Sequence, residues 1–589
     1  MNVSPSTPRA AWRRLAALAA VALLATAACD RERATAGASD GALDGAVSET
    51  WSPDGLEHVR DVPVNAIEGA IAARLERGAR PKGLDDRDWK RVLRLYETYG
   101  NRPLWLEEDG DSERADQLID ALAAVHEHGL RSELYPLEEL AAALRPIDKA
   151  RHPSPEQLAQ ADVMLTSIYV ALGEDLLTGQ VDPDDVAQEW RIDPQTSDVD
   201  SLLARTLRGQ PLSRAIERMR PQDEQYDLLR KELKRYRELA AGGGWGQVPA
   251  GKSLKPGDRA PAARLAALRE RLAAEGYLDG AARETTGEGR DAASAGVYDR
   301  ELAGAVAAFQ ARHGIVVDSI LGPGTVASMN VPVEHRVGQI MANLERYRWL
   351  PRSLGDRYIY VNVPAFRLDA YDDGRRVLSM KVIVGDEYED RATPAFADSM
   401  RYLEFAPYWN VPKEIAEKEI WPTVDADPGY LERNDYEIVE ENGETRIRQK
   451  PGEKNALGRV KFMFPNPLNI YLHDTPEHAL FREDVRAFSH GCIRVEKPAE
   501  LAAYALAGQR EWTRERIEEA MNGENRQVPL ARKIPIYIVY FTTFVRDGKL
   551  YFGNDIYERD DELVRTVERA ALPTPRAVRL LAELRELVD

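Results

Sequence analysis

The residues best suited to chemistry lie in one short run, Ser489-His490-Gly491-Cys492-Ile493-Arg494. A cysteine thiol has a reference pKa of about 8.5, so only a small fraction is thiolate at neutral pH. An imidazole within hydrogen-bonding distance can take the thiol proton and keep the nucleophile charged. His473, nineteen residues before Cys492, is suited to this role. The pair predicts acyl transfer with Cys492 as nucleophile and His473 as proton acceptor and donor.

Two neighbours of Cys492 fit this chemistry. Gly491 permits a tight backbone path, so that amides around Cys492 can point at one spot and form an oxyanion hole. One such donor contributes roughly 3 to 4 kcal/mol to stabilisation of a transition state. Arg494 adds a positive charge that is expected to depress the thiol pKa and that can bind a carboxylate.

Other chemistries are less well supported by the residues. A cysteine beside a histidine is often buried and inert. A metal site built from His473, Asp474, His490 and Cys492 is conceivable, but a metal would occupy the thiolate. Neither a Cys-x-x-Cys nor a His-Glu-x-x-His spacing occurs, and no Gly-x-Ser-x-Gly elbow or Lys-Thr-Gly is present. We therefore expect no metal and no cofactor.

Strands are predicted to position this pair. From about residue 357 the apolar residues alternate with a period of two, as in Tyr358–Val363, Val377–Val384 and Ile534–Phe541. His473 ends a further predicted strand that begins at Ile470. A polar, hairpin-like stretch at about 425–455 interrupts the pattern and could fold over a cleft as a lid. Tyr408, Trp409 and Trp421, just before that stretch, could line such a cleft but are assigned mainly to core packing.

Helical periodicity dominates the first part of the chain. Apolar residues recur at steps of three and four between residues 61 and 240, as in Trp89, Val92 and Tyr96. A Gly- and Pro-rich linker separates this stretch from a smaller helical segment at 262–332. The sequence therefore predicts a multidomain α+β protein. It has a helical domain at 61–240, a small three-helix module at 262–332, a β-rich domain at 357–541 and a terminal hairpin and helix at 542–589.

The Ser-His-Gly-Cys-Ile-Arg run with its upstream histidine resembles the catalytic signature of bacterial L,D-transpeptidases. The resemblance implies that Cys492 is the nucleophile and His473 the proton donor and acceptor. Gly491, Ser489 and Arg494 match supporting positions, whereas His490 stands where the large subfamily can have Ser.

Further residues extend the resemblance. Tyr471, two residues before His473, is expected to support the site or contact substrate. The segment at 262–332 resembles a peptidoglycan-binding module through Phe309, Gln310, His313 and Gly314, with Ser319 where such modules often have Gly. With the helical domain as a scaffold, the chain resembles the large multidomain subfamily.

This resemblance implies acyl transfer between peptidoglycan stem peptides in cell wall biogenesis. Cys492 would attack the third residue of a tetrapeptide donor and expel the terminal D-alanine. A side-chain amine of a second stem would then accept the acyl group and make a 3-3 cross-link. Carbapenems would acylate the same cysteine. Two alternatives stay open at this point: a thiol hydrolase, either an L,D-carboxypeptidase or an amidase, and a non-enzymatic wall-binding scaffold.

The N-terminus predicts export. Arg9, Arg13 and Arg14 precede an apolar stretch at 15–28, which would rise only about 21 Å as a helix, less than the bilayer core of about 30 Å. We expect a signal peptide at 1–28 and a flexible linker at 29–60. Either the signal peptide is an ordinary one that is cleaved without lipidation, or Cys29 is lipidated and anchors the protein to a membrane.

The predicted location is extracytoplasmic, in the periplasm. There Cys492 would have no second thiol in the mature chain except Cys29. The net charge of −19 disfavours binding to nucleic acid.

Overall fold

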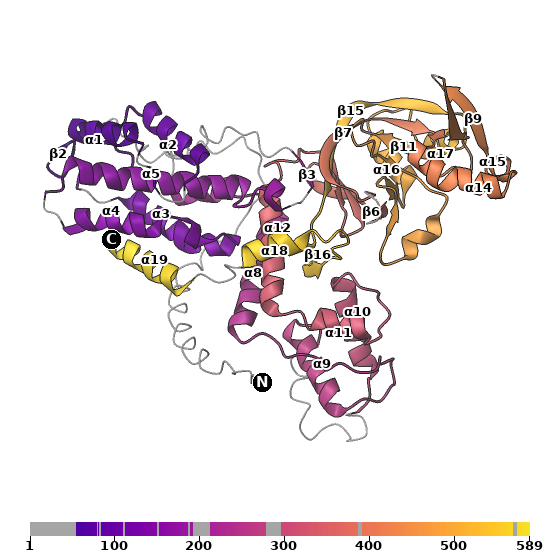
Figure 1. The fold of residues 1–589 in the computed structure, drawn as a ribbon, viewed down its shortest axis with the longest axis horizontal. Helices are drawn as coiled ribbons and strands as arrows, with labels where there is room; N and C mark the ends of the chain where they lie inside the picture. Colours follow the sequence, from indigo (N-terminus) through magenta and orange to yellow (C-terminus); the bar gives the residue numbers. More distant parts are fainter. Residues whose placement is uncertain are drawn as a thin grey trace, which may run out of the picture. The chain divides into compact units, whose positions relative to one another are not determined.

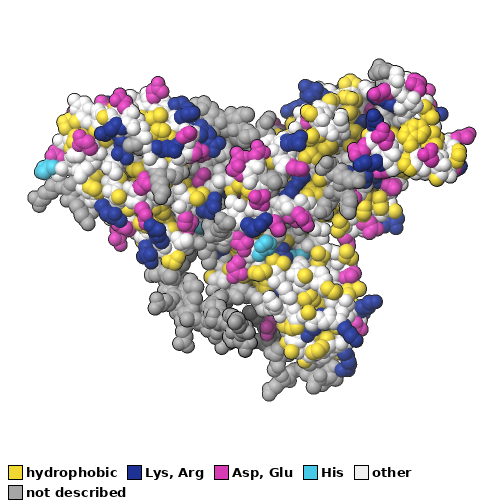
Figure 2. Space-filling view, viewed as in Figure 1, with side chains coloured by type: hydrophobic (Ala, Val, Ile, Leu, Met, Phe, Trp, Pro, Cys, Tyr) yellow, Lys and Arg dark blue, Asp and Glu magenta, His cyan; other side chains and the backbone are white. Residues whose placement is uncertain are grey.

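The computed structural model describes residues 55–588 except 79, 82–83, 110–111, 150–151, 187–188, 193–211, 279–295, 387–390, 442 and 569–573. The predicted signal peptide at 1–28, Cys29 and most of the linker lie outside the described residues. In the described part no helix is both long enough and apolar enough to cross a bilayer. Basic and acidic side chains are interspersed on the visible face, without one large basic area (Figure 2).

The N-terminal domain is built from helices packed around one buried helix, α5 (Pro155–Thr178). The Ser154 hydroxyl accepts a hydrogen bond from the Gln157 amide, and the Gln157 side chain accepts one from the Ser154 amide, so a capping box fixes where α5 begins. Apolar residues lie on every side of α5, which explains its central place in the core. Figure 1 shows it among its neighbours. These are α1 (Val64–Glu76), α2 (Asp86–Thr98), α3 (Glu113–Ala124), α4 (Leu137–Lys149) and α7 (Leu212–Met219).

Shorter elements complete this region. A two-stranded ribbon, β1 (His58–Val59) with β2 (Val62–Pro63), precedes α1. Three turns of 3-10 helix follow at Val125–His128, Ser132–Leu134 and Pro183–Val186, and β3 (Trp190–Arg191) pairs with a strand of the β-rich domain. The region ends with α8 (Glu224–Ala241), which the Asp223 carboxylate caps through the Gln225 amide.

The small helical module has its own core. It contains α9 (Ala262–Ala274), α10 (Arg300–Arg312) and α11 (Pro323–Met329), as expected from the sequence. Leu268, Val306 and Phe309 are fully buried between these helices. The Gln310 side chain binds Asp318 at 2.8 Å and Thr325 at 3.1 Å, which fixes the loop between α10 and α11.

The β-rich domain is a closed, mixed sheet. Its strand order is β11-β12-β14-β6-β5-β4-β15-β7-β3, and β11 also pairs with β7, which closes the ring. Alternate residues point into one apolar core, which includes Val361, Val382, Ile493 and Ile538. Most neighbours are antiparallel, but β12 runs parallel to β14, β15 to β4, β3 to β7 and β13 to β6. The helices α16 (Pro498–Ala505) and α17 (Arg514–Met521) contribute to the same core.

The strands of this sheet have the following bounds: β4 (Tyr358–Asn362), β5 (Arg367–Asp372), β6 (Arg375–Gly385), β7 (Ala395–Phe405), β11 (Val460–Met463), β12 (Leu472–His473), β13 (Ala487–Ser489), β14 (Ile493–Val495) and β15 (Arg526–Val539). The short strand β13 pairs with β6 beside β14.

The insert, residues 409–449, is a small unit with its own apolar cluster. Val411, Ala416, Ile420 and Ile447 form that cluster, and Trp409 and Trp421 pack against it. The expected hairpin is present as β9 (Tyr436–Glu441) and β10 (Glu444–Gln449), but the unit begins earlier because β8 (Trp409–Asn410) pairs with β10. The intervening chain forms α13 (Lys413–Ile415), a π-helical turn at Ala416–Ile420, α14 (Trp421–Ala426) and α15 (Tyr430–Arg433) (Figure 1).

One buried helix and the chain's last elements link these units. α12 (Val333–Arg348) is buried along most of its length. Its Arg346 pairs with Asp560 at 2.6 Å, at the start of α18 (Asp560–Glu568). The hairpin β16 (Thr543–Arg546) and β17 (Lys549–Phe552) precedes α18. The final helix, α19 (Pro575–Val588), packs on α3 and α4, where Leu584 is fully buried in the core of the helical domain (Figure 1).

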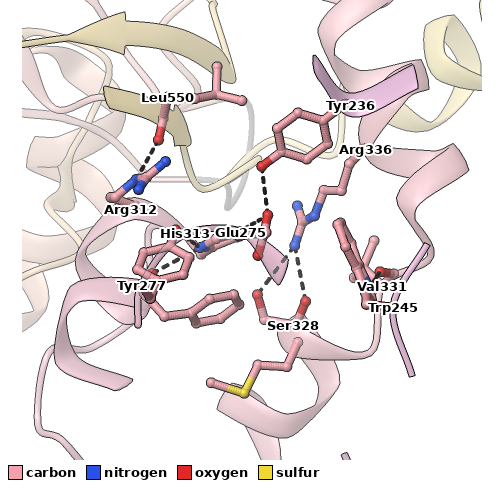
Figure 3. A network of polar contacts seen from close by, with 12 residues as sticks. Tyr236, Trp245, Glu275, Tyr277, Arg312, His313, Ser328, Val331, Arg336 and Leu550 are labelled. Atoms are coloured by element: carbon pink, nitrogen blue, oxygen red, sulfur yellow. Dashed lines mark hydrogen bonds and ion pairs between the residues drawn. The ribbon is translucent and has the colours of Figure 1, made fainter. Parts of the chain in front are cut away.

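A buried polar network anchors the small module (Figure 3). Glu275 accepts hydrogen bonds at 2.6 Å from the Tyr236 hydroxyl of α8 and from Arg271. Arg312 donates to the Leu550 carbonyl of β17 at 2.8 Å. Burial alone would raise the pKa of Glu275, but the neighbouring His313 and Arg271 side chains, aided by the Tyr236 hydroxyl, overcome it and lower the pKa to about 2. The module is therefore held to α8 and β17 by charged groups removed from water.

Replacing Glu275 with Ala should destabilise the protein at pH 7, because Arg271 would stay buried without its partner. Breaking a buried ion pair costs about 3 to 5 kcal/mol. The folded-state pKa of Glu275 lies below the unfolded value, so its contribution is present above about pH 4.3 and is lost as the pH falls toward 2. Denaturant unfolding at pH 7 and pH 3 measures both effects.

Glu301→Ala is the matched control. It removes a carboxylate that faces Arg269 at 3.5 Å in an exposed pair, and such pairs contribute about 0 to 1 kcal/mol. Equal losses of stability in the two variants would contradict a special role for the buried network.

Candidate active site

Two neighbouring strands bring the predicted pair together. β12 and β14 run parallel, with Leu472 opposite Ile493 and His473 opposite Arg494. The Ile493 amide donates to the Tyr471 carbonyl at 3.0 Å, which extends the pairing back to Cys492. Since alternate residues share a face, Tyr471, His473, Cys492 and Arg494 all project from the same face of the sheet. The sequence-predicted nucleophile and base are therefore diagonal neighbours.

Cys492 is a partly buried residue, and its sulfur contacts a loop that the sequence analysis did not single out. The thiol faces the Asn469 carbonyl, with 3.7 Å between sulfur and oxygen. Asn466 holds this loop in shape: its amide nitrogen donates to the Phe464 and Ile470 carbonyls, each at 2.7 Å. Asn469 has φ of 54°, in the left-handed region that Asn tolerates better than most residues. The only signal in the sequence was the turn-forming Pro465-Asn466-Pro467.

His473 is buried and neutral. Its Nδ1 lies 2.5 Å from the Asp474 carbonyl oxygen, which can only accept, so Nδ1 carries the proton and Nε2 is left as the proton acceptor. Burial, followed by the charges of Arg494 and Lys461, lowers the pKa of His473 to about 3, although the Asp474 carbonyl opposes the shift. Among the described residues no hydrogen bond joins His473 to Cys492, and such contacts often tighten only when substrate binds.

The expectation of a resting thiolate is wrong. Burial raises the pKa of Cys492, and the opposing effects of Tyr471, Lys461 and Arg494 are smaller. Arg494, which was expected to depress the thiol pKa and bind a carboxylate, already pairs with Glu477. The resting site thus holds a neutral thiol and a neutral imidazole, and the proton must move during attack.

The turn before Cys492 is fixed by side chains. The buried Ser489 hydroxyl donates to the Cys492 carbonyl and accepts from the Gly491 amide at 3.3 Å. The Thr393 hydroxyl donates to the Gly491 carbonyl at 3.0 Å. Gly491 has φ of +104°, so a residue with a side chain would be strained there, as expected. Ser489 therefore shapes the turn and does not face the sulfur.

The predicted oxyanion hole has fewer free backbone donors than expected. The Gly491 amide is engaged by Ser489 and the Ile493 amide by Tyr471. Within the described chain the Cys492 amide makes no hydrogen bond, so it is the donor left for an oxyanion at this turn.

His490 contacts the insert and not the sulfur. It is exposed, and its Nε2 lies 2.7 Å from a Glu419 carboxylate oxygen. Glu419 belongs to the π-helical turn of the insert and also pairs with Arg391 at 3.2 Å. His490 therefore joins the nucleophile loop to the insert.

Across the described ranges no three His, Cys, Asp or Glu side chains gather as metal ligands.

A polar hollow of about 260 Å³ lies beside the nucleophile. Residues of the closed sheet and of the insert both line it, and the role of the insert as a lid stays a prediction. Tyr408 and Trp409 line it as well, in addition to the packing role that the sequence suggested for Trp409. Its full lining is Glu404, Tyr408, Trp409, Asn410, Arg448, Leu457, Lys461, Tyr471 and Asn525. Sequence reasoning missed Glu404 and Lys461, because a single charged residue within a strand carries no signal by itself.

Comparisons with known proteins agree with this architecture. Residues 356–515 match the model of the L,D-transpeptidase catalytic domain, residues 262–329 match that of a "putative peptidoglycan binding domain", and residues 90–233 match that of a scaffold domain. A Haemophilus influenzae protein named "putative L,D-transpeptidase" is 31% identical over 249 residues, which cover 39% of this chain and 50% of that protein. The alignment thus spans about half the length of the curated relative.

A solved structure was also compared. A crystal structure of an L,D-transpeptidase from Xylanimonas cellulosilytica is 16% identical, with a TM-score of 0.15, and covers 49% of this chain and 99% of that one.

The reactivity of Cys492 toward iodoacetamide should rise with pH. The thiol pKa is raised, so the thiolate fraction should grow roughly tenfold per pH unit between pH 6 and 8. Mass mapping of the Cys492 peptide after short exposures measures this rate separately from Cys29. His473→Gln should keep the same slope, since His473 does not ionise the resting thiol. A rate that is flat from pH 6 to 8 would mean a preformed thiolate–imidazolium pair.

Proposed function

We propose that this chain, which carries an L,D-transpeptidase catalytic domain with a scaffold domain and a peptidoglycan-binding domain, cross-links peptidoglycan stem peptides through Cys492. The observation that carries the proposal is the pairing of β12 with β14. It sets the Cys492 thiol and the unprotonated Nε2 of His473 on one face, beside a hollow large enough for part of a peptide.

The first half-reaction forms a thioester. Nε2 of His473 takes the thiol proton while the Cys492 sulfur attacks the carbonyl carbon of the third residue of a tetrapeptide donor. The Cys492 amide donates to the oxygen that becomes negative. The bond to the terminal D-alanine then breaks, and its nitrogen receives the proton from the imidazolium. Free D-alanine leaves, and the acyl group stays on sulfur.

The second half-reaction reverses these proton movements. A side-chain amine of another stem peptide attacks the thioester carbonyl, and His473 takes the amine proton. The carbon–sulfur bond breaks, the proton returns to sulfur, and a 3-3 cross-link remains.

The low pKa of His473 suits this cycle. A buried imidazolium next to Arg494 and Lys461 is a strong acid, so it gives its proton readily to the departing amine. A neutral resting pair also means that no thiolate and no imidazolium form until substrate is in place. The chemistry therefore depends on a proton that moves with the attack.

The setting follows from the substrate. Peptidoglycan lies outside the cytoplasm, which agrees with a signal peptide at 1–28 and with Cys29 as a lipid anchor or a residue at the cleavage boundary. In this proposal Cys492 is also the residue that carbapenems acylate. The enzyme is then a cysteine acyltransferase of the periplasm.

Purified protein incubated with tetrapeptide muropeptides should give cross-linked dimers and one D-alanine for each cross-link, measured by chromatography and mass spectrometry. Cys492→Ala should give neither product, and His473→Gln should slow D-alanine release about 100-fold or more, since general-base catalysis contributes roughly 10²- to 10⁴-fold. No D-alanine release by the wild type and no carbapenem adduct on Cys492 would contradict the proposal. Tripeptide monomers without dimers would assign hydrolysis to the same cysteine.

A further inference from the structure

The hollow beside Cys492 contains three charged side chains, and two of them are engaged. Arg448 pairs with Glu437 of the insert and lies over the Tyr408 ring at 4.2 Å. Glu404 accepts a hydrogen bond from the Asn525 amide at 2.9 Å. Each of these charges therefore has a partner within the protein.

Lys461 is the exception. Within the described chain its ammonium makes no hydrogen bond and no ion pair. Its nitrogen lies instead 3.8 Å from the centre of the Tyr471 ring. A cation over an aromatic face is held in place, but its charge is only weakly neutralised. No carboxylate of the described chain therefore lies within ion-pairing distance of this half-buried ammonium.

The strand register places this ammonium at the reacting atoms. Lys461 lies on β11 directly opposite His473 of β12, and on the other side it lies opposite Glu404 of β7. It is close enough to Cys492 for its charge to favour the thiolate form of that residue. Burial lowers the pKa of Lys461, and the attraction of Glu404, followed by that of a Cys492 thiolate, opposes this shift. Arg494, the cation that the sequence suggested for carboxylate binding, is paired with Glu477. Lys461 is thus the cation of this site that remains open to an incoming anion.

We propose that Lys461 and the surrounding hollow form a subsite for a carboxylate of the donor peptide. This inference rests on the proposed function, which makes the ligand a stem peptide with its third residue at Cys492. Two carboxylates of such a donor lie near the attacked carbonyl: the terminal α-carboxylate of the leaving residue, and a carboxylate on the side chain of the third residue. An ammonium–carboxylate contact out of water selects donors that carry this charge and fixes the carbonyl over the sulfur.

Binding to full-length protein in the Cys492→Ala background tests the subsite without turnover. Three tetrapeptides are titrated calorimetrically: the free acid, the C-terminal amide and the peptide amidated at the third side chain. Lys461→Met should weaken binding of the free acid by roughly 10-fold or more, since a hydrogen bond to a charged group contributes about 1.5 to 3 kcal/mol. Lys461→Arg keeps the charge and should retain most of the affinity.

The amides identify the carboxylate. Amidation of the carboxylate that Lys461 binds should weaken binding to the Cys492→Ala protein that retains Lys461 by a similar factor. With that amidated peptide, Lys461→Met should have no further effect on binding. Loss of the effect with the C-terminal amide assigns the leaving residue, and loss with the side-chain amide assigns the third residue. An unchanged affinity in Lys461→Met, or an equal loss for all three peptides, would overturn the proposal.

Two controls separate the subsite from trivial causes. Lys413→Met removes the same charge from an exposed position of the insert and should leave all three affinities unchanged. Lys461→Gln, which keeps a polar group, replaces Lys461→Met if the latter lowers the unfolding midpoint.

With Cys492 present, Lys461→Met should raise KM for the free-acid donor more than it lowers kcat. If the wild type releases no D-alanine while the Lys461-dependent binding persists, the proposed function fails and the subsite stands.

Discussion

The parallel pairing of β12 with β14 is the constraint on which the site depends. These strands are only two and three residues long, yet their register decides which four side chains share a face. A shift by one residue would send Cys492 toward the core and leave His473 facing Ile493. The neighbours prevent such a shift: β11 holds β12 from one side, and β6 holds β14 from the other. The closed sheet thus sets the geometry of a site that these two short strands could not set alone.

The charge balance of the site favours a neutral Cys492–His473 pair at rest. His473 is neutral because it is buried beside two cations, and Cys492 is neutral because burial opposes the thiolate. The lysine at this site lies over an aromatic ring and faces the hollow. Substrate would therefore complete the electrostatics as well as supply the reacting carbonyl. The insert contributes to the same enclosure through Glu419, which contacts His490 of the nucleophile loop.

Much of this could be predicted from local patterns. Period-two alternation located β4, β6 and β12, and because side chains alternate along a strand, Tyr471 and His473 had to share a face. The nucleophile and its base followed from residue chemistry. The pairing of β11 with β7 could not be predicted, because one sequence does not show which distant strands become neighbours. Lys461, Asn466 and the contact of His490 with Glu419 were missed for the same reason.

The thiol was also misjudged from the sequence. The charge of Arg494 is visible in the sequence, but its pairing with Glu477 and the burial of the sulfur are not. Local charge therefore predicted the wrong sign of the pKa shift, because desolvation depends on the whole fold.

The position of α19 bears on how the molecule is made. Its Leu584 occupies the core formed by α3, α4 and α5, more than four hundred residues earlier in the chain. A ribosome builds that helical domain first, but the domain lacks part of its interior until α19 has been synthesised. A premature stop that spared every residue of the catalytic chemistry would still leave a hole in the first domain synthesised. Packing of the N-terminal domain thus depends on synthesis having passed the catalytic domain and reached α19.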